Sequence, residues 1–264
     1  MKRLFLILLI LSSIKIFSQD TLFVNAEYIP HMDTALVFVP SNYNPDTSYP
    51  LIFMLHGYSG NYGQWNLIVN LDSVAKKDNV IIVCPDGFYD SWYVNSPLRK
   101  NSQYEKFFFE NLTPLVFQKY NIDKKNIFIT GLSMGGHGAI YLFLRHPDFF
   151  KSAGSTSGIL DITAFPENWS LPKVLGSYVL HQKTWQKNSD IYLLKTLKDK
   201  KRQIIVDCGT EDFAFKVNQA FNDSCVALGI PIKFIKGPGA HTSDYWQKSL
   251  LQHFVFFKNL IDKK

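Results

Sequence analysis

The amino-acid sequence predicts an α/β fold in which helices cover both faces of a mostly parallel β-sheet. Segments with the pattern of strands alternate with segments of helical periodicity along the 264 residues, and this alternation is typical of βαβ crossovers. Several strand-like segments are continuous apolar runs, such as YPLIFMLHG at residues 49–57, which indicates strands buried on both faces. The length is sufficient for one domain with a large core.

The predicted elements follow one another in a regular order. Two early strands are joined by a polar turn and six further strands follow, of which those at 49–57 and 80–87 read as buried. The eight segments are residues 21–30, 34–40, 49–57, 80–87, 126–130, 151–158, 203–209 and 231–237. Helical patterns lie near residues 67–77, 104–120, 138–146 and 217–228, and Pro114 is expected to kink or interrupt the second of these. Residues 159–201 are less periodic and are interpreted as a partly helical insertion over one end of the sheet.

The first eighteen residues have the layout of a secretory signal peptide. Lys2 and Arg3 precede a short apolar run from Leu4 to Leu11, and a small residue, Ser18, stands near the expected cut. The apolar run is too short to cross a bilayer comfortably. We therefore expect cleavage after Ser18, no stable membrane anchor, a secreted or periplasmic protein, and a single catalytic domain over residues 19–264.

Charge and cysteine content exclude several classes of function. Loss of the three basic residues of the signal peptide lowers the formal net charge from +6 to +3, and no basic stripe with interleaved aromatic residues is present, so nucleic acid is not an expected partner. Cys84, Cys208 and Cys225 form no CxxC pair. The sequence does not decide whether two of the three cysteines form a disulfide. Neither a metal nor an organic cofactor is expected. The oligomeric state is not defined by the sequence.

A glycine-rich stretch after the fifth predicted strand carries the main functional signal. Gly131, Ser133 and Gly135 match the G-x-S-x-G motif, and Gly136 and Gly138 follow directly. In this motif a strand turns so sharply into a helix that the serine lies at the apex with its hydroxyl exposed, and the two flanking glycines avoid collisions that side chains would cause. The motif stands between a strand pattern and a helical pattern, as this geometry requires. Ser133 is therefore the candidate nucleophile.

A serine hydroxyl needs a base and, behind it, an orienting carboxylate. Of the seven histidines, His241 stands in a Gly-rich loop after the last predicted strand, at the sheet edge where ligands collect in such folds. The predicted strand at residues 203–209 and the loop after it offer Asp207, Glu211 and Asp212; Asp207 falls within the strand and Glu211 is one residue early, so Asp212 is the candidate. The order Ser133, Asp212, His241 fits an α/β-hydrolase fold.

With these motifs in place, the chain resembles the putative-esterase (esterase D-like) family of α/β-hydrolases. The matching pieces run in family order from residue 49 to 246: YPLIFMLHGYSGNYGQW, VIIVCPDG, SWYVNSP, GLSMGGHGA, STSG, CGTEDF and PGAHTSDYW. The resemblance implies a Ser133–His241–Asp212 triad, with an oxyanion hole formed by the backbone N–H groups of Tyr58 and Met134. Ala240 stands where many relatives have glycine, and Ser243 where many have tryptophan. The resemblance therefore does not define which acyl group or sugar the substrate carries.

The expected function is that of an exported serine carboxylic-ester hydrolase. The family includes tributyrin, acetylxylan and feruloyl esterases, so the resemblance implies short-chain acyl or feruloyl esters, either small molecules or linked to polysaccharides. Aromatic residues near the site are candidates for a substrate wall, with core packing as their alternative role: Trp65, Trp92, Tyr93, Trp169 and Trp246. The alternatives are an acyltransferase on the same scaffold and a secreted carbohydrate-binding homologue without catalysis.

Overall fold

The computed structural model describes residues 19–197 and 201–261. The signal-peptide prediction concerns residues 1–18, which lie outside the described residues. Within residues 19–197 and 201–261, no helix has both the length and the apolar character needed to cross a membrane.

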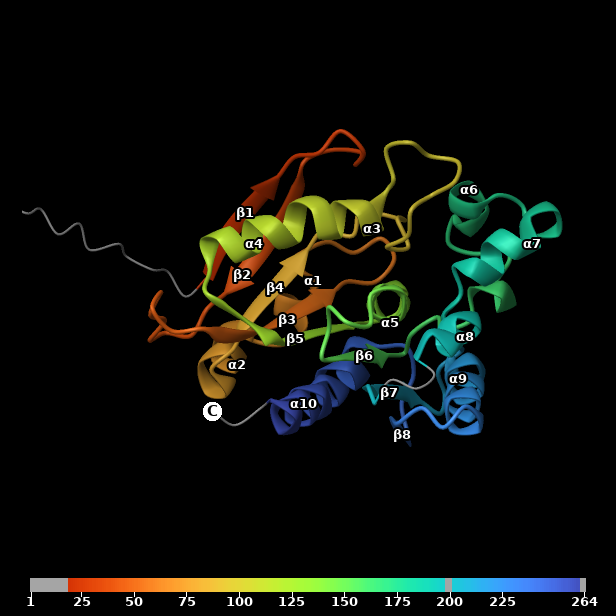
Figure 1. The fold of residues 1–264 in the computed structure, drawn as a ribbon. Helices are drawn as coiled ribbons and strands as arrows, with labels where there is room; N and C mark the ends of the chain where they lie inside the picture. Colours follow the sequence, from red (N-terminus) through yellow and green to blue (C-terminus); the bar gives the residue numbers. More distant parts are fainter. Residues whose placement is uncertain (1–18, 198–200, 262–264) are drawn as a thin grey trace, which may run out of the picture.

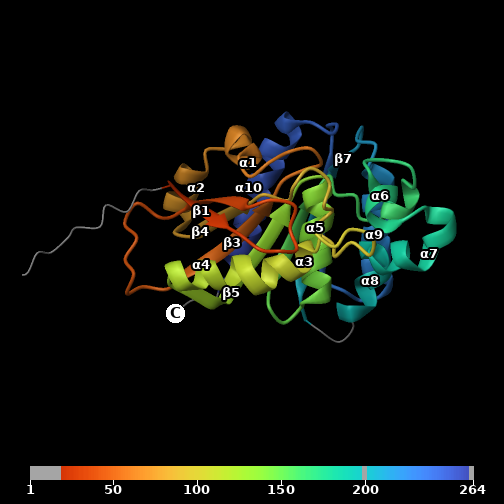
Figure 2. The ribbon, with the colours of Figure 1, turned by 90° about the horizontal axis from the view of Figure 1, so that it is seen from above.

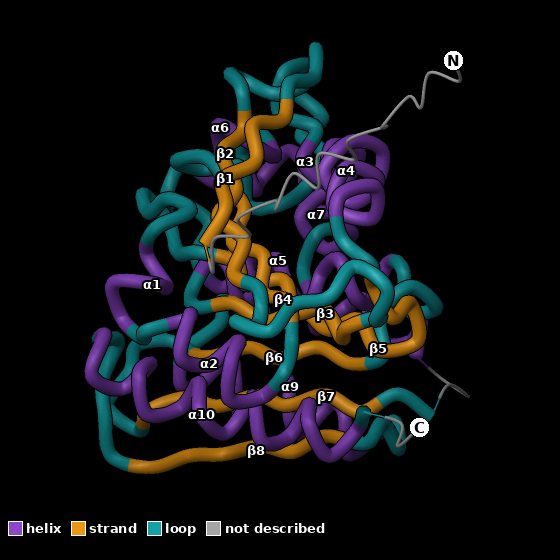
Figure 3. Tube along the Cα trace, turned by 90° about the vertical axis from the view of Figure 1, so that its left-hand side faces the viewer, coloured by secondary structure: helices purple, strands orange, loops and turns teal. Residues whose placement is uncertain are grey.

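An eight-stranded sheet forms the centre of the molecule (Figure 1), in the order β1-β2-β4-β3-β5-β6-β7-β8. Strands β1 and β2 form an antiparallel pair and β2 is antiparallel to β4, whereas all later pairs are parallel. The mostly parallel sheet predicted from the sequence is thus confirmed. Figure 3 shows its strong twist from β1 and β2 to β7 and β8. The bounds are β1 Gln19–Val24, β2 Asp33–Phe38, β3 Tyr49–Leu55, β4 Ile81–Pro85, β5 Ile122–Gly131, β6 Ser152–Thr156, β7 Gln203–Gly209 and β8 Ile232–Gly237.

Helices cover both faces of this sheet (Figure 2). One face packs against α1 (Gln64–Ile68), α2 (Leu71–Asp78) and α10 (Ser243–Leu260), and the other packs against α3 (Tyr104–Phe107), α4 (Thr113–Lys119), α5 (Met134–Arg145) and α9 (Phe215–Ala227). Successive side chains of a strand point to opposite faces. Accordingly Phe53 of β3 joins one buried cluster and Met54 joins the other. This two-sided burial explains why the strands are continuous apolar runs.

Three helical segments differ from the sequence-based expectation. The pattern at residues 67–77 is divided between α1 and α2, because the side chain of Asn70 caps α2 by accepting the N–H of Ser73 at 2.9 Å. The segment 104–120 contains a π-helical turn, η1 (Phe108–Leu112), after which α4 starts with Pro114 in its first turn. Proline is tolerated there because a first-turn N–H has no intrahelical partner. The long C-terminal helix α10 was not expected.

The described part of the insertion, residues 159–197, is largely helical and lies beside the sheet. It contains η2 (Ile162–Ala164), α6 (Leu171–Leu175), α7 (Tyr178–Lys187), α8 (Asp190–Leu193) and η3 (Leu194–Leu197). Helices α6 and α7 project at one end of the molecule (Figure 1), while α8 contacts both α5 and α9. Residues Ile159 and Trp169 border the same pocket as Ser133. The insertion therefore forms part of the candidate site. All three cysteines are buried free thiols.

Candidate active site

Ser133 lies at a strained bend between β5 and α5. Its backbone has φ 54° and ψ −118°, a conformation that a non-glycine residue adopts only where the surroundings enforce it. A Cβ added at Gly131 would lie 2.1 Å from the carbonyl oxygen of Gly135, and one added at Gly135 would lie 2.2 Å from that of Leu55. The bend is therefore too crowded for side chains at both positions. The Ser133 N–H donates to Thr156 O at 3.0 Å, which ties the bend to β6.

Three side chains from distant parts of the chain form one hydrogen-bonded row. His241 Nε2 lies 2.9 Å from Ser133 Oγ, and His241 Nδ1 lies 2.9 Å and 3.1 Å from Asp212 Oδ2 and Oδ1. An ionised carboxylate only accepts hydrogen bonds, so Nδ1 carries the proton and Nε2 is left as the acceptor for the serine hydroxyl. The structure thus brings together the three residues that the sequence singled out, with the histidine in the tautomer that a base requires.

The electrostatics of Asp212 favour its ionised form. Asp212 follows β7 and His241 follows β8, and the Asp212 side chain is fully buried. Burial acts to raise the pKa of Asp212, but the hydrogen bond from His241 and the one from the Ala214 N–H outweigh it, so the net pKa lies below the usual value. A carboxylate that stays ionised in a buried place can orient His241 and stabilise positive charge on it.

The backbone N–H groups of Tyr58, which borders the pocket with Ser133, and of Met134, which follows Ser133 in the chain, have no acceptor within the described residues. Tyr58 follows the β3 strand and borders the same pocket as Ser133. Met134 is the first residue of α5, so its N–H belongs to the positive end of the helix dipole. Unpaired donors beside a nucleophile are suited to bind an oxygen that becomes negative. The family resemblance implies this role for both residues.

A pocket of about 210 Å³ opens at Ser133 and His241. Aromatic side chains make much of its wall. Trp92 donates its indole N–H to the carbonyl of Trp169 at 3.0 Å, and Trp246 meets the ring of His241 edge-on at 5.0 Å between centroids. The lining consists of Gly57, Tyr58, Gln64, Trp92, Leu132, Ser133, Ile159, Trp169, Phe213, His241 and Trp246.

Two aromatic residues expected at this wall lie in the core instead. Trp65 is buried among the residues under α1, α2 and α10, and its indole N–H donates to Leu55 O at 2.9 Å. Tyr93 is buried against Gly138, and its hydroxyl donates to the His56 carbonyl at 2.8 Å. Neither borders the pocket. In both cases core packing, the alternative role, is the correct one.

Phe213 is an aromatic pocket residue that the sequence interpretation missed. It follows Asp212 directly and is 50% exposed. Its ring centroid lies 4.5 Å from that of His241 and 5.5 Å from that of Trp169. The available signal was its position next to the candidate orienting carboxylate. Phe213 therefore connects the insertion with the loop that carries Asp212.

The two rejected candidate carboxylates, Asp207 and Glu211, and the buried His137 have other partners. Asp207 binds His253 of α10 at 2.6 Å, and Glu211 accepts the N–H of Gly239. His137 of α5 binds Asp190 of α8 at 3.0 Å, and both side chains are fully buried. Neither Asp207 nor Glu211 competes with Asp212 for His241.

The sheet order, the bend at Ser133 and the row that ends at Asp212 define an α/β-hydrolase. The sequence profile of the family described as "Putative esterase" matches residues 27–257. The chain belongs to this family and is a carboxylic ester hydrolase.

Individual relatives agree with this assignment. An acetyl esterase from Caldicellulosiruptor saccharolyticus is 26% identical over 227 residues, which cover 80% of this chain and 84% of that protein. The solved structure of a ferulic acid esterase has a TM-score of 0.77 at 25% identity and covers 92% of this chain and 98% of its own. A fluorophosphonate-binding serine hydrolase from Staphylococcus aureus has a TM-score of 0.80 at 22% identity, with coverage of 92% and 98%, and this likeness concerns the fold.

Proposed function

We propose that this protein is an exported serine esterase in which Ser133, His241 and Asp212 are the catalytic triad, within a catalytic domain of residues 19–264. The observation that carries the proposal is the continuous row of hydrogen bonds from Ser133 Oγ through His241 to Asp212, with both links at 2.9 Å. These separations lie within the reach required of a nucleophile, its base and the group that orients the base.

The reaction proceeds in two similar halves. His241 Nε2 takes the hydroxyl proton while Ser133 Oγ attacks the ester carbonyl, and Asp212 stabilises the resulting imidazolium. The carbonyl oxygen, now negative, is bound by the N–H groups of Tyr58 and Met134. His241 then gives its proton to the departing alcohol, which leaves an acyl group on Ser133. Water repeats these steps and releases the carboxylic acid.

The pocket favours a short acyl group. Its volume of about 210 Å³ lies below the range of roughly 300–1,000 Å³ that is usual for sites of drug-sized ligands. An acetyl-like group is therefore the first candidate, in keeping with the acetyl esterase relative. The aromatic wall of Trp92, Trp169 and Phe213 supports a second candidate, a feruloyl ester whose ring stacks there. Of the aromatic residues expected at the wall from the sequence, Trp92, Trp169 and Trp246 border the pocket and remain the proposed substrate contacts.

Export rests on the N-terminal sequence. The basic start, the short apolar run and Ser18 predict cleavage by a signal peptidase. A secreted or periplasmic esterase would meet acylated polysaccharides, which we propose as natural substrates beside small esters. Sequencing the N-terminus of the mature protein tests this step directly. A mature chain that still begins at Met1 would contradict it.

The activity is tested with a series of p-nitrophenyl esters and methyl ferulate. We expect hydrolysis of the acetate and butyrate, slow reaction of the octanoate, and a loss in kcat of about 10⁴-fold or more in Ser133→Ala. Ser224→Ala is the matched control, because that hydroxyl only bonds back to Ala220 O within α9. Full activity in Ser133→Ala would refute the assignment. Transfer to added alcohols in preference to water would indicate an acyltransferase, and an inert wild-type chain would indicate a binding protein.

A further inference from the structure

The peptide unit between Gly57 and Tyr58 carries one of the two proposed oxyanion donors. In a trans peptide the carbonyl oxygen of one residue and the N–H of the next point in opposite directions within one plane, and the described residues contain no cis peptide bond. The direction of the Gly57 carbonyl therefore fixes the direction of the Tyr58 N–H. Whatever holds this carbonyl also aims the donor.

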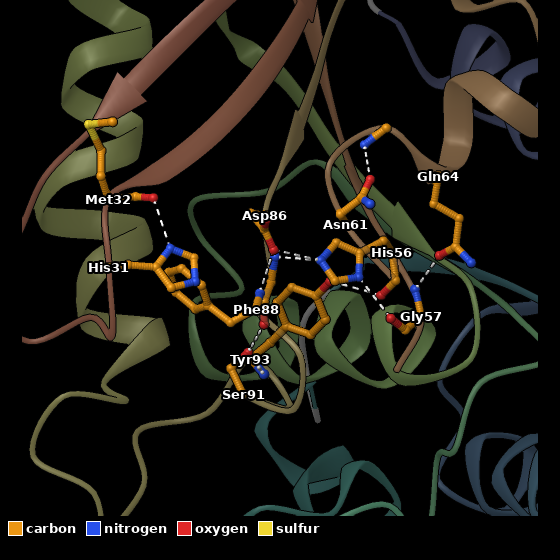
Figure 4. Close-up of polar contacts among 12 residues, drawn as sticks. His31, Met32, His56, Gly57, Asn61, Gln64, Asp86, Phe88, Ser91 and Tyr93 are labelled. Carbon is orange, nitrogen blue, oxygen red and sulfur yellow. Dashed lines mark hydrogen bonds and ion pairs between the residues drawn. The ribbon is translucent and has the colours of Figure 1, made fainter. Parts of the chain in front are cut away.

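His56 contacts the Gly57 carbonyl through one ring nitrogen and the chain after β4 through the other (Figure 4). Its Nδ1 lies 2.7 Å from Gly57 O, and its Nε2 lies 2.6 Å from the backbone nitrogen of Gly87. A carbonyl only accepts and an amide N–H only donates, so Nδ1 carries the proton and Nε2 accepts. Asp86 Oδ1 is farther from Nε2, at 3.2 Å, and accepts the N–H of Phe88.

The imidazole is fixed in the core. His56 is 1% exposed, and its own carbonyl accepts the hydroxyl of the buried Tyr93 at 2.8 Å. The hydrogen bond with Gly87, which follows β4, determines which ring nitrogen faces Gly57. The ring thus presents one N–H, in one orientation, to one carbonyl. Because both ring nitrogens are engaged by backbone groups, His56 can orient the peptide but does not contact the substrate.

The loop that receives this hydrogen bond is strained. Ser59 has φ 58°, a left-handed conformation that non-glycine residues adopt only when neighbouring contacts enforce it. A second donor, the N–H of Gly60, reaches Gly57 O at 3.0 Å, and the N–H of Ser59 donates to Tyr89 O at 2.9 Å. The Gly57 carbonyl is therefore held by two donors, of which His56 is the closer.

We propose that His56 is a positioning residue for the oxyanion hole: its Nδ1–H fixes the Gly57–Tyr58 peptide so that the Tyr58 N–H points at the oxygen of the reacting ester. This inference rests on the proposed esterase function. The hydrogen bond also polarises the peptide it binds, which strengthens the N–H at the other end. Its effect is exerted on the transition state, because the oxygen is negative only there.

Two conservative substitutions separate the two hydrogen bonds of the ring. In His56→Asn, the amide nitrogen takes the position of Nδ1 and can still donate to Gly57 O, while the bond from Gly87 is lost. In His56→Gln, the amide oxygen reaches the position of Nε2 and can still accept from Gly87, while the donor to Gly57 is lost. Each variant removes one buried hydrogen bond, so the two are matched for loss of stability.

The proposal predicts that kcat separates the two variants. Deleting an oxyanion donor costs about 10²–10³-fold in kcat, but in His56→Gln the Gly60 N–H still holds the carbonyl. We therefore expect kcat for p-nitrophenyl acetate about tenfold lower in His56→Gln than in His56→Asn, with similar KM. Equal kcat in the two variants, or the lower kcat in His56→Asn, would overturn the proposal.

A second readout does not depend on ester turnover. Phosphonylation by a fluorophosphonate also places a developing negative oxygen in the hole, so its rate should fall in the same ratio, while the final adduct stays at one per chain in both variants. The melting temperatures of the two variants should be similar. If His56 had only a structural role, variants of equal melting temperature would also have equal kcat. If the wild-type chain is phosphonylated but hydrolyses no ester, the proposed function is refuted. The role of His56 is then tested by the ratio of the phosphonylation rates of the two variants. A wild-type chain that does neither contradicts both.

Discussion

Replacing Gly135 by alanine tests the crowding at the bend most sharply. The added Cβ would lie 2.2 Å from Leu55 O and 2.5 Å from His56 O. Both neighbours are backbone atoms and cannot rotate away. Ordinary contact begins at about 3.4 Å, so α5 and the end of β3 must separate by about 1.2 Å. This displacement moves Ser133 away from the Tyr58 N–H.

The expected magnitudes follow from this displacement. Forcing an extra group into a packed site costs about 3 kcal/mol of unfolding free energy, which for a domain of this size lowers the melting temperature by roughly 6–12 °C. A misplacement of about 1 Å costs on the order of 10²-fold in catalysis. We therefore expect Gly135→Ala to be less stable and to lose about 99% of kcat/KM for p-nitrophenyl acetate.

The measurement compares Gly135→Ala with Gly237→Ala. A Cβ at Gly237 would meet no atom within 4 Å, so this control should keep wild-type activity and melting temperature. Thermal unfolding followed by circular dichroism gives the stability, and kinetics well below the transition give the activity of folded protein. If Gly135→Ala matches Gly237→Ala in both, the argument that the bend excludes side chains is wrong.

Three further predictions concern the surroundings of this bend. Asp212→Asn should lower kcat by about 10⁴-fold, because an amide can hold His241 in the wrong tautomer; steady-state kinetics with unchanged KM would show it, and a loss below tenfold would contradict it. Phe213→Ala opens the pocket wall, so the ratio of octanoate to acetate hydrolysis should rise several-fold, and an unchanged ratio would exclude Phe213 from acyl selection. Burial, partly offset by His137, raises the pKa of Asp190 from 3.8 to about 6. The folded state then binds the extra proton, so this contribution to stability is complete below pH 3.8 and is lost as the pH rises through about 6. Urea unfolding across this range should show that decline in the wild type, and an equal decline in Asp190→Asn would refute it.

The sequence was sufficient for the fold class and for the residues that meet at Ser133. The G-x-S-x-G motif and the strand and helix patterns around it are enough to predict the bend, although part of the crowding that requires Gly135 comes from the backbone of Leu55 and His56 at the end of β3. His241 and Asp212 follow because parallel strands end at the same edge of the sheet. This argument does not require His241 and Asp212 to be close in the sequence.

Other features depend on packing that no local pattern contains. Trp65, Tyr93 and Trp92 are all large aromatic residues, and only the tertiary structure decides which of these rings borders the pocket. The role of His56 depends on Gly87, a residue of another strand end. The helix α10 did have a readable signal, because its buried residues Trp246, Leu250 and Phe254 stand four apart.

The central claim is that the bend presents the oxygen of Ser133 to His241 as a nucleophile. Its most direct test is to treat the folded protein with a fluorophosphonate and to locate the adduct by peptide mass spectrometry. The account predicts one adduct per chain, on Ser133, absent in Ser133→Ala and formed far more slowly in His241→Gln. An adduct on another residue, or none on the native protein, would contradict it.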